Sequence, residues 1–142
     1  MRKATIGFVM MLCSVVAFGQ EPQWQVVSSL FVTHGTEPAQ KTILVPEKES
    51  IYRLSLYFSG GGAEKSEKAY FVAKLVGFDI SGAQFQNSET LSCNTKSVYS
   101  TPPMTVSLKP GVGLGYFVTA YNAPTGSCQY NLAIIVEQLV QQ

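Results

Sequence analysis

Charged residues are scarce in this chain of 142 residues. Asp, Glu, Lys and Arg together make up 13% of it, and it contains one histidine, His34, and one aspartate, Asp79. A hydrolytic triad needs a nucleophile beside a histidine and a carboxylate, and no serine lies in a nucleophile-elbow motif. A metal centre needs several His, Cys, Asp or Glu ligands together. We therefore expect a protein that is not an enzyme and that holds no metal or other cofactor.

Basic residues are also too few and too dispersed for a polyanion-binding surface. Ten Lys and Arg residues stand against nine acidic residues. Nucleic-acid backbones and anionic lipid surfaces attract clustered Lys and Arg side chains. No such cluster or stripe is present, so the sequence predicts no nucleic-acid partner and no polybasic membrane contact.

No apolar run is long enough to span a bilayer. The longest covers about residues 4–18, which is shorter than the ~20 residues of a spanning helix. It follows Arg2 and Lys3 and ends in small residues, a pattern typical of a secretory signal. The alternative, a membrane anchor, lacks a basic stop-transfer cluster. We predict a cleaved signal peptide over residues 1–19, a mature domain over residues 20–142, a secreted or periplasmic location, and no membrane insertion after cleavage.

Cysteine is rare, with three in the chain. Cys13 lies inside the predicted signal, and the bulky residues before it disfavour a lipid anchor. Cleavage leaves Cys93 and Cys128 as the thiols of an exported protein, which predicts a disulfide between them. The alternative is two free buried cysteines.

In residues 20–142, apolar residues recur with the period of two that is typical of β-strands, and not with a helical period. Short runs of β-branched and aromatic residues alternate with polar ones, and Gly, Pro, Asn and Ser separate the runs. In the clearest run, residues 51–58, one face carries Tyr52, Leu54, Leu56 and Phe58. In the run over residues 130–137, one face carries Tyr130, Leu132, Ile134 and Val136. We expect this last strand to lie in the middle of a sheet.

Other short runs complete an all-β pattern. Further strands are expected over residues 24–33, 41–45, 70–78, 84–92, 104–108 and 115–121. Turns or breaks are expected at Ser81-Gly82, Pro102-Pro103 and Lys109-Pro110-Gly111, and loops over residues 60–68 and 122–127. About eight to ten strands without helices predict a two-sheet antiparallel β-sandwich of the jelly-roll type, with a barrel as the alternative.

Two parts of the chain, residues 43–57 and residues 104–137, resemble the complement-type globular head and the tumour-necrosis-factor-like jelly rolls. Residues 43–57, ILVPEKESIYRLSLY, are similar to the early strand pair of that superfamily. Residues 104–137 resemble its final part, where a strand, a turn and a strand precede a closing strand. Here Ser50-Ile51 stands where the family usually has a glycine, and there is no collagen-like or coiled stalk. The resemblance implies a jelly roll that packs as a homotrimer and binds other molecules on its exposed face.

Low charge and apolar residues on both faces of some strands favour self-association. Residues 70–78 are nearly all apolar, and Ile134 and Ile135 point to opposite faces of one strand. We therefore expect a non-catalytic exported interaction module, a homotrimer that associates through an apolar sheet face and takes an extracellular protein or glycan as ligand. The candidate ligand or interface aromatics are Tyr57, Tyr99, Tyr116 and Tyr121.

Two other functions stay open. One is a carbohydrate-binding or adhesion domain, which requires a row of exposed aromatic rings. The other is a small secreted hydrolase or inhibitor, for which residues 122–127 before Cys128 would be the inhibitory loop. Among smaller motifs, we interpret Glu47 and Glu49 as a solvated turn rather than a catalytic carboxylate pair. We interpret His34 as a loop residue, and Gly60-Gly61-Gly62 as a loop tip rather than a phosphate loop.

Overall fold

The computed structural model describes residues 21–62, 68–93, 96–123 and 128–140. The predicted signal over residues 1–19, with Cys13, lies outside these ranges, as does most of the proposed inhibitory loop. No helix among the described residues is long and apolar enough to cross a membrane. The described residues form strands and the turns between them.

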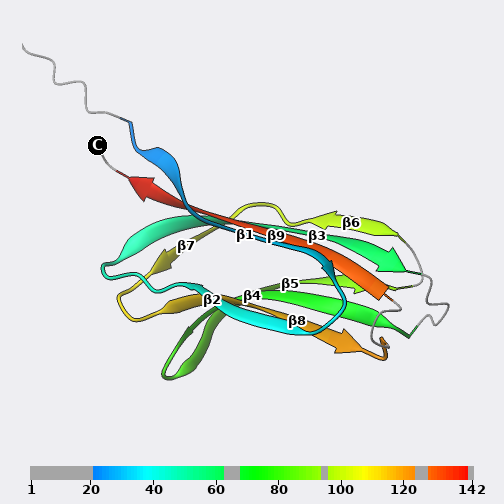
Figure 1. Ribbon diagram of the computed structural model, residues 1–142. Helices are drawn as coiled ribbons and strands as arrows, with labels where there is room; N and C mark the ends of the chain where they lie inside the picture. Colours follow the sequence, from blue (N-terminus) through cyan, green and yellow to red (C-terminus); the bar gives the residue numbers. More distant parts are fainter. Residues whose placement is uncertain (1–20, 63–67, 94–95, 124–127, 141–142) are drawn as a thin grey trace, which may run out of the picture.

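In the described part of the chain, nine strands form two antiparallel sheets that face each other (Figure 1). They are β1 (Gln23–Gly35), β2 (Ala39–Leu44), β3 (Ser50–Gly62), β4 (Tyr70–Asp79), β5 (Gly82–Ser92), β6 (Ser97–Ser100), β7 (Met104–Leu108), β8 (Gly113–Tyr121) and β9 (Cys128–Val140). Sheet A has the order β1-β9-β3-β6, and β7 also pairs with β3. Sheet B has the order β2-β8-β4-β5. As predicted, β9 lies in the middle of its sheet.

Strands β6 and β7 behave as one interrupted strand. Both pair with β3, one at each end of it, and Pro102 and Pro103 lie between them. Proline has no N–H to extend the ladder, so the pairing stops there. The Thr101 N–H donates a hydrogen bond of 3.0 Å to the Leu56 carbonyl and holds the break against β3. With β6 and β7 counted as one, the described residues form eight strands, four in each sheet, in the strand order of a jelly roll, as predicted.

The core lies between the sheets and follows the predicted alternation. The four apolar residues predicted on one face of β3 and the four on β9 are all buried. Sheet B contributes Phe71, Ala73, Leu75, Leu114, Tyr116 and Val118. Tyr130 packs edge-on against Phe58 and Phe71, with ring centroids 5.7 and 5.0 Å away. Each large apolar side chain buried in this way contributes roughly 1.5–3 kcal/mol.

The predicted disulfide between Cys93 and Cys128 is present. The two buried residues have Cα atoms 5.5 Å apart and are 35 residues apart in sequence. Cys93 follows β5 and Cys128 begins β9, so the bond joins sheet B to sheet A. The Gly62 N–H donates a hydrogen bond of 3.2 Å to the Cys93 carbonyl, which keeps the end of β3 beside the disulfide.

The prediction of a loop from Gly60 is wrong for residues 60–62, which continue β3 in register with β9. Gly60 has φ +143°, and a Cβ there would overlap the carbonyl oxygen of Gln129. Glycine is needed because β9 runs so close, so here it indicates strand packing rather than a loop. Strand β6 is also absent from the strands predicted above.

The predicted turns at Lys109-Pro110-Gly111 and Ser81-Gly82 are present. In the first, the Val112 N–H donates to the Lys109 carbonyl at 3.1 Å, and Gly111 has φ +84°. In the second, Asp79 Oδ1 accepts hydrogen bonds from the Ser81 hydroxyl and N–H at 2.6 and 2.7 Å. The Ser81 hydroxyl, followed by the Ser81 N–H, lowers the pKa of Asp79. The hairpin places Ile80 at its fully exposed tip.

Candidate functional site

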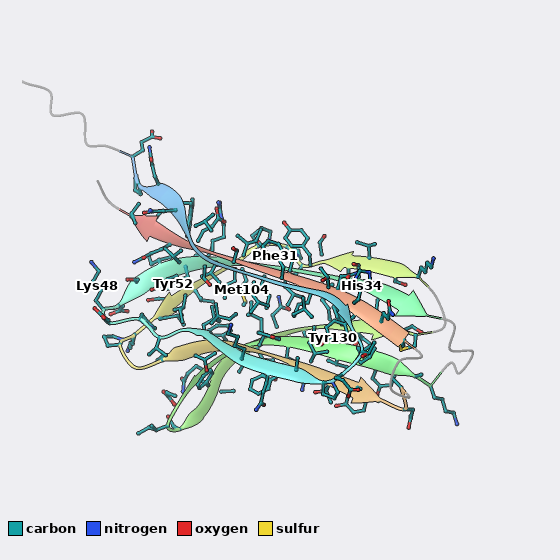
Figure 2. The ribbon with its side chains drawn as sticks, in the orientation of Figure 1. Phe31, His34, Lys48, Tyr52, Met104 and Tyr130 are labelled. Atoms are coloured by element: carbon teal, nitrogen blue, oxygen red, sulfur yellow. A yellow bond between two sulfur atoms is a disulfide. The ribbon has the colours of Figure 1, made fainter. Side chains whose placement is uncertain are left out.

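The middle of the outer face of sheet A carries several apolar side chains, with serines between them. Phe31 on β1, Ala133 on β9 and Tyr57 on β3 form one cross-strand row. Phe31 is 67% exposed and points away from the sandwich (Figure 2). Ile135 lies in the adjacent row, and Val98 on β6 is 82% exposed. We call these five residues the apolar face.

The charges beside the apolar face neutralise each other. Arg53 on β3 and Glu137 on β9 are cross-strand partners, and Arg53 Nε and Nη2 each donate to a Glu137 carboxylate oxygen at 2.6 Å. The hydrogen bond from Arg53 lowers the pKa of Glu137, and the same bond raises the pKa of Arg53. The Trp24 ring centroid lies 4.7 Å from the guanidinium carbon. The pair therefore adds no net charge to this side of sheet A.

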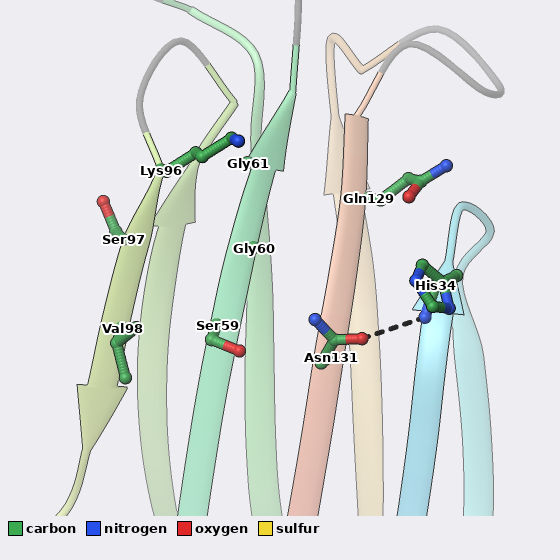
Figure 3. Close-up of a pocket in the computed structure, with 9 residues that line it drawn as sticks. All are labelled: His34, Ser59, Gly60, Gly61, Lys96, Ser97, Val98, Gln129 and Asn131. Atoms are coloured by element: carbon green, nitrogen blue, oxygen red, sulfur yellow. Dashed lines mark hydrogen bonds between the residues drawn. The ribbon is translucent and has the colours of Figure 1, made fainter.

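A pocket of about 400 Å³ lies at the end of this face, where β1, β9, β3 and β6 lie side by side (Figure 3). Gly60 and Gly61 form its floor without side chains. Lys96 lies on the β6 side, His34 on the β1 side, and Asn131 between them. Ser59, Ser97, Val98 and Gln129 complete the described lining.

The pocket depends on an irregularity in the pairing of β1 with β9. The register shifts between Val32 and Gly35, and His34 there has φ +54°, a conformation that non-glycine residues seldom adopt. Its N–H donates to Asn131 Oδ1 at 3.0 Å. Because the oxygen is engaged, the Asn131 amide nitrogen faces β3 and the Ser59 hydroxyl (Figure 3).

Of the four tyrosines singled out from the sequence, three are at the surface, but they do not form one site. Tyr57 belongs to the apolar face. Tyr99 is partly exposed on β6, and Tyr121 stacks on Tyr70 of sheet B with centroids 4.8 Å apart. Tyr116 is wrong as a surface candidate: it is 6% exposed, because it shares the inner face of β8 with Leu114 and Val118.

The outer face of sheet B carries a second aromatic surface. Phe117 on β8 is 38% exposed, and shallow hollows of about 320 and 280 Å³ flank it. Gln40 on β2 lies opposite it and lines both hollows. The Phe78 ring lies over the backbone of Gly113, where a Cβ would be 2.7 Å from the ring.

The smaller motifs are surface features. Glu47 and Glu49 are exposed between β2 and β3, and Glu49 Oε1 accepts a hydrogen bond of 3.1 Å from the Ser107 hydroxyl. Within the described part of the chain, no group of three or more His, Cys, Asp and Glu residues is placed to hold a metal ion. The interpretation of His34 as a loop residue is wrong, because His34 lies within β1, at the register shift where it has a positive φ. Its neighbours in the pocket, Asn131 and Lys96, are not indicated by the sequence.

Neither a family model nor a curated protein sequence matches the chain. Among solved structures, it is similar to tripeptidyl peptidase 2, with 14% identity and a TM-score of 0.40 over 84% of this chain and 10% of that one. It is also similar to the VP2 subviral particle of infectious bursal disease virus, with 9% identity and a TM-score of 0.30 over 87% of this chain and 42% of that one. The chain thus spans less than half the length of either. Similarity at this level carries no argument, so the fold assignment rests on the strand order.

Proposed function

We propose that this protein is a non-catalytic exported interaction module that self-associates as a homotrimer through the outer face of sheet A. The observation that carries the proposal is the apolar face. Phe31 is 67% exposed in a single chain and lies in one row with Ala133 and Tyr57. Contiguous exposed apolar patches of this kind are typical of protein interfaces.

The electrostatics of sheet A support a packed interface. An unpaired charge would have to be desolvated on association, which is unfavourable. Arg53 and Glu137 already satisfy each other through two hydrogen bonds. Association would therefore bury apolar surface, at roughly 25 cal/mol per Å², without leaving either of these charges unpaired.

The sequence supports two further parts of the proposal, the trimeric state and the export of the protein. The resemblance to tumour-necrosis-factor-like jelly rolls implies a trimer that packs through the sheet of the closing strand, and β9 here is an interior strand of sheet A, between β1 and β3. The predicted signal peptide supports export, and the Cys93–Cys128 disulfide is compatible with an extracellular or periplasmic location.

Light scattering after size exclusion tests the proposal on residues 20–142 under non-reducing conditions. The expected molar mass is about three times that of one chain. Phe31→Glu should lower it toward one chain mass, because a carboxylate would have to be buried in the interface. Ile80→Glu is the matched control, since it changes a fully exposed residue at the tip of the β4–β5 hairpin in sheet B. A monomeric or dimeric wild type, or a trimer unaffected by Phe31→Glu, would contradict the proposal.

A second candidate, a carbohydrate-binding or adhesion domain, is favoured by the surface around Phe117. Exposed aromatic rings stack on the apolar faces of sugars, and Gln40 and Thr42 beside Phe117 make no side-chain hydrogen bond to another described residue. A glycan array read with wild type and Phe117→Ala tests it. Binding that Phe117→Ala abolishes and Ile80→Ala retains would support it, whereas a blank array would count against it.

A further inference from the structure

We infer that the pocket between His34 and Lys96 is a binding site for the carboxylate of an acidic sugar. This site goes beyond self-association, because it would bind a small molecule at the end of sheet A; Val98 belongs both to its described lining and to the apolar face. It lies at the end of sheet A, on strands whose register brings together His34 and Asn131, 97 residues apart in sequence.

The charge of the pocket matches an anion. Lys96 contributes an ammonium group, which forms no ion pair or hydrogen bond with another described residue. No Asp or Glu is present among the described residues of the lining. In Figure 3 the Lys96 side chain reaches across toward Gly61, over the floor of the pocket. A ligand carboxylate in this position would pair with the ammonium group without meeting an acidic side chain of the described lining.

Asn131 adds a donor that the fold holds in one orientation. Its Oδ1 accepts the His34 backbone N–H at 3.0 Å, and its two amide N–H donors, which form no hydrogen bond with another described residue, face the pocket. The positive φ of His34 is part of this arrangement, and strained backbone of this kind is concentrated at functional sites. The Lys96 ammonium group and the Asn131 amide N–H groups line the same pocket and together form a subsite for a carboxylate.

The remaining lining favours a sugar as the source of the carboxylate. The floor stays open because Gly60 cannot hold a side chain beside Gln129. The Ser59 hydroxyl and the Gln129 amide both donate and accept, as sugar hydroxyls require, and neither makes a side-chain hydrogen bond to another described residue. A volume of about 400 Å³ lies within the range of small-molecule sites.

Isothermal titration of residues 20–142 with D-galacturonate and N-acetylneuraminate tests the site. D-galactose is the neutral control, and N-acetyl-glycyl-glycine presents a carboxylate on a peptide. We expect saturable binding of at least one acidic sugar and at least about ten-fold weaker binding of galactose. Failure of both acidic sugars to bind would overturn the inference, and so would equal binding of galactose. Binding of the peptide but of neither acidic sugar would overturn the assignment to a sugar.

Asn131→Asp is the sharpest variant. It retains an oxygen that accepts the His34 N–H but replaces the amide donor with a negative oxygen, so affinity for the acidic sugar should fall at least about ten-fold. Gln86→Glu adds the same charge on exposed β5 of sheet B and should leave the affinity within about two-fold. Unchanged affinity in Asn131→Asp would overturn the site. Phe31→Glu keeps the two proposals separate, since it should change the molar mass and leave the pocket intact.

Discussion

Arg53 and Glu137 lie directly opposite each other on β3 and β9, and two hydrogen bonds of 2.6 Å join the guanidinium to the carboxylate. The Trp24 ring lies 4.7 Å from the guanidinium carbon. Bidentate geometry makes this pair stronger than an ordinary surface ion pair. It also joins the middle strand of sheet A to β3, beside the proposed interface.

Glu137→Gln should therefore change the pH dependence of stability. The pKa of Glu137 is lowered by Arg53, so the pair stabilises the fold above the ordinary pKa of a glutamate, about 4.3, and this stabilisation is lost as the pH falls through the lower folded pKa. The stability difference between wild type and variant should be largest near about pH 7 and much smaller near about pH 3. Urea unfolding at both pH values measures it. An equal difference at the two would show that the ion pair is not the cause.

The disulfide is expected to supply a sizeable part of the stability. Replacing Cys93 and Cys128 together by serine should lower the free energy of unfolding by about 2–5 kcal/mol, because the bond restricts the unfolded chain. Chemical denaturation of the wild type and the double variant under the same non-reducing buffer gives the value. A reduced wild type should behave like the variant. A loss well below this range would mean that packing between the two sheets holds β5 near β9 without the disulfide.

Gly60→Ala should destabilise the protein more than Gly82→Ala. Both glycines have positive φ, +143° and +115°, so both substitutions introduce backbone strain. Only at Gly60 would the new Cβ overlap backbone, at the Gln129 carbonyl, whereas nothing lies within 4 Å at Gly82. We expect an additional loss of about 1–3 kcal/mol at Gly60. Thermal unfolding of the two variants measures the effect of this overlap on stability. Equal losses of stability would mean that backbone strain alone accounts for both.

The sequence predicts the core better than the candidate site, because the core depends on local alternation. Leu54 and Leu56 are buried because each lies two residues from the next inward-facing side chain, and this period can be read directly. The same alternation also predicts that Ile135 lies on the opposite face of its strand from Ile134. The pocket depends instead on a register shift in β1 that brings His34 to Asn131. No spacing rule relates residues so far apart, and a glycine run such as Gly60-Gly61 is ambiguous between a loop and a closely packed strand.

Tyr130→Phe tests the link between the core and the connection from β1 to β2. The Tyr130 hydroxyl donates a hydrogen bond of 2.9 Å to the Glu37 carbonyl, and loss of this bond should lower stability by about 1 kcal/mol at neutral pH. Burial raises the pKa of Tyr130, so its contribution is complete below the ordinary tyrosine pKa of about 10 and is lost as the pH rises through the folded pKa. Alkaline unfolding followed by circular dichroism should therefore show a smaller loss of stability in Tyr130→Phe than in wild type.

Tyr57→Phe is the control, because Tyr57 is exposed and its hydroxyl has no hydrogen-bond partner among the described residues. If both variants resist alkali equally, the effect belongs to tyrosines in general and the Glu37 contact does not determine it.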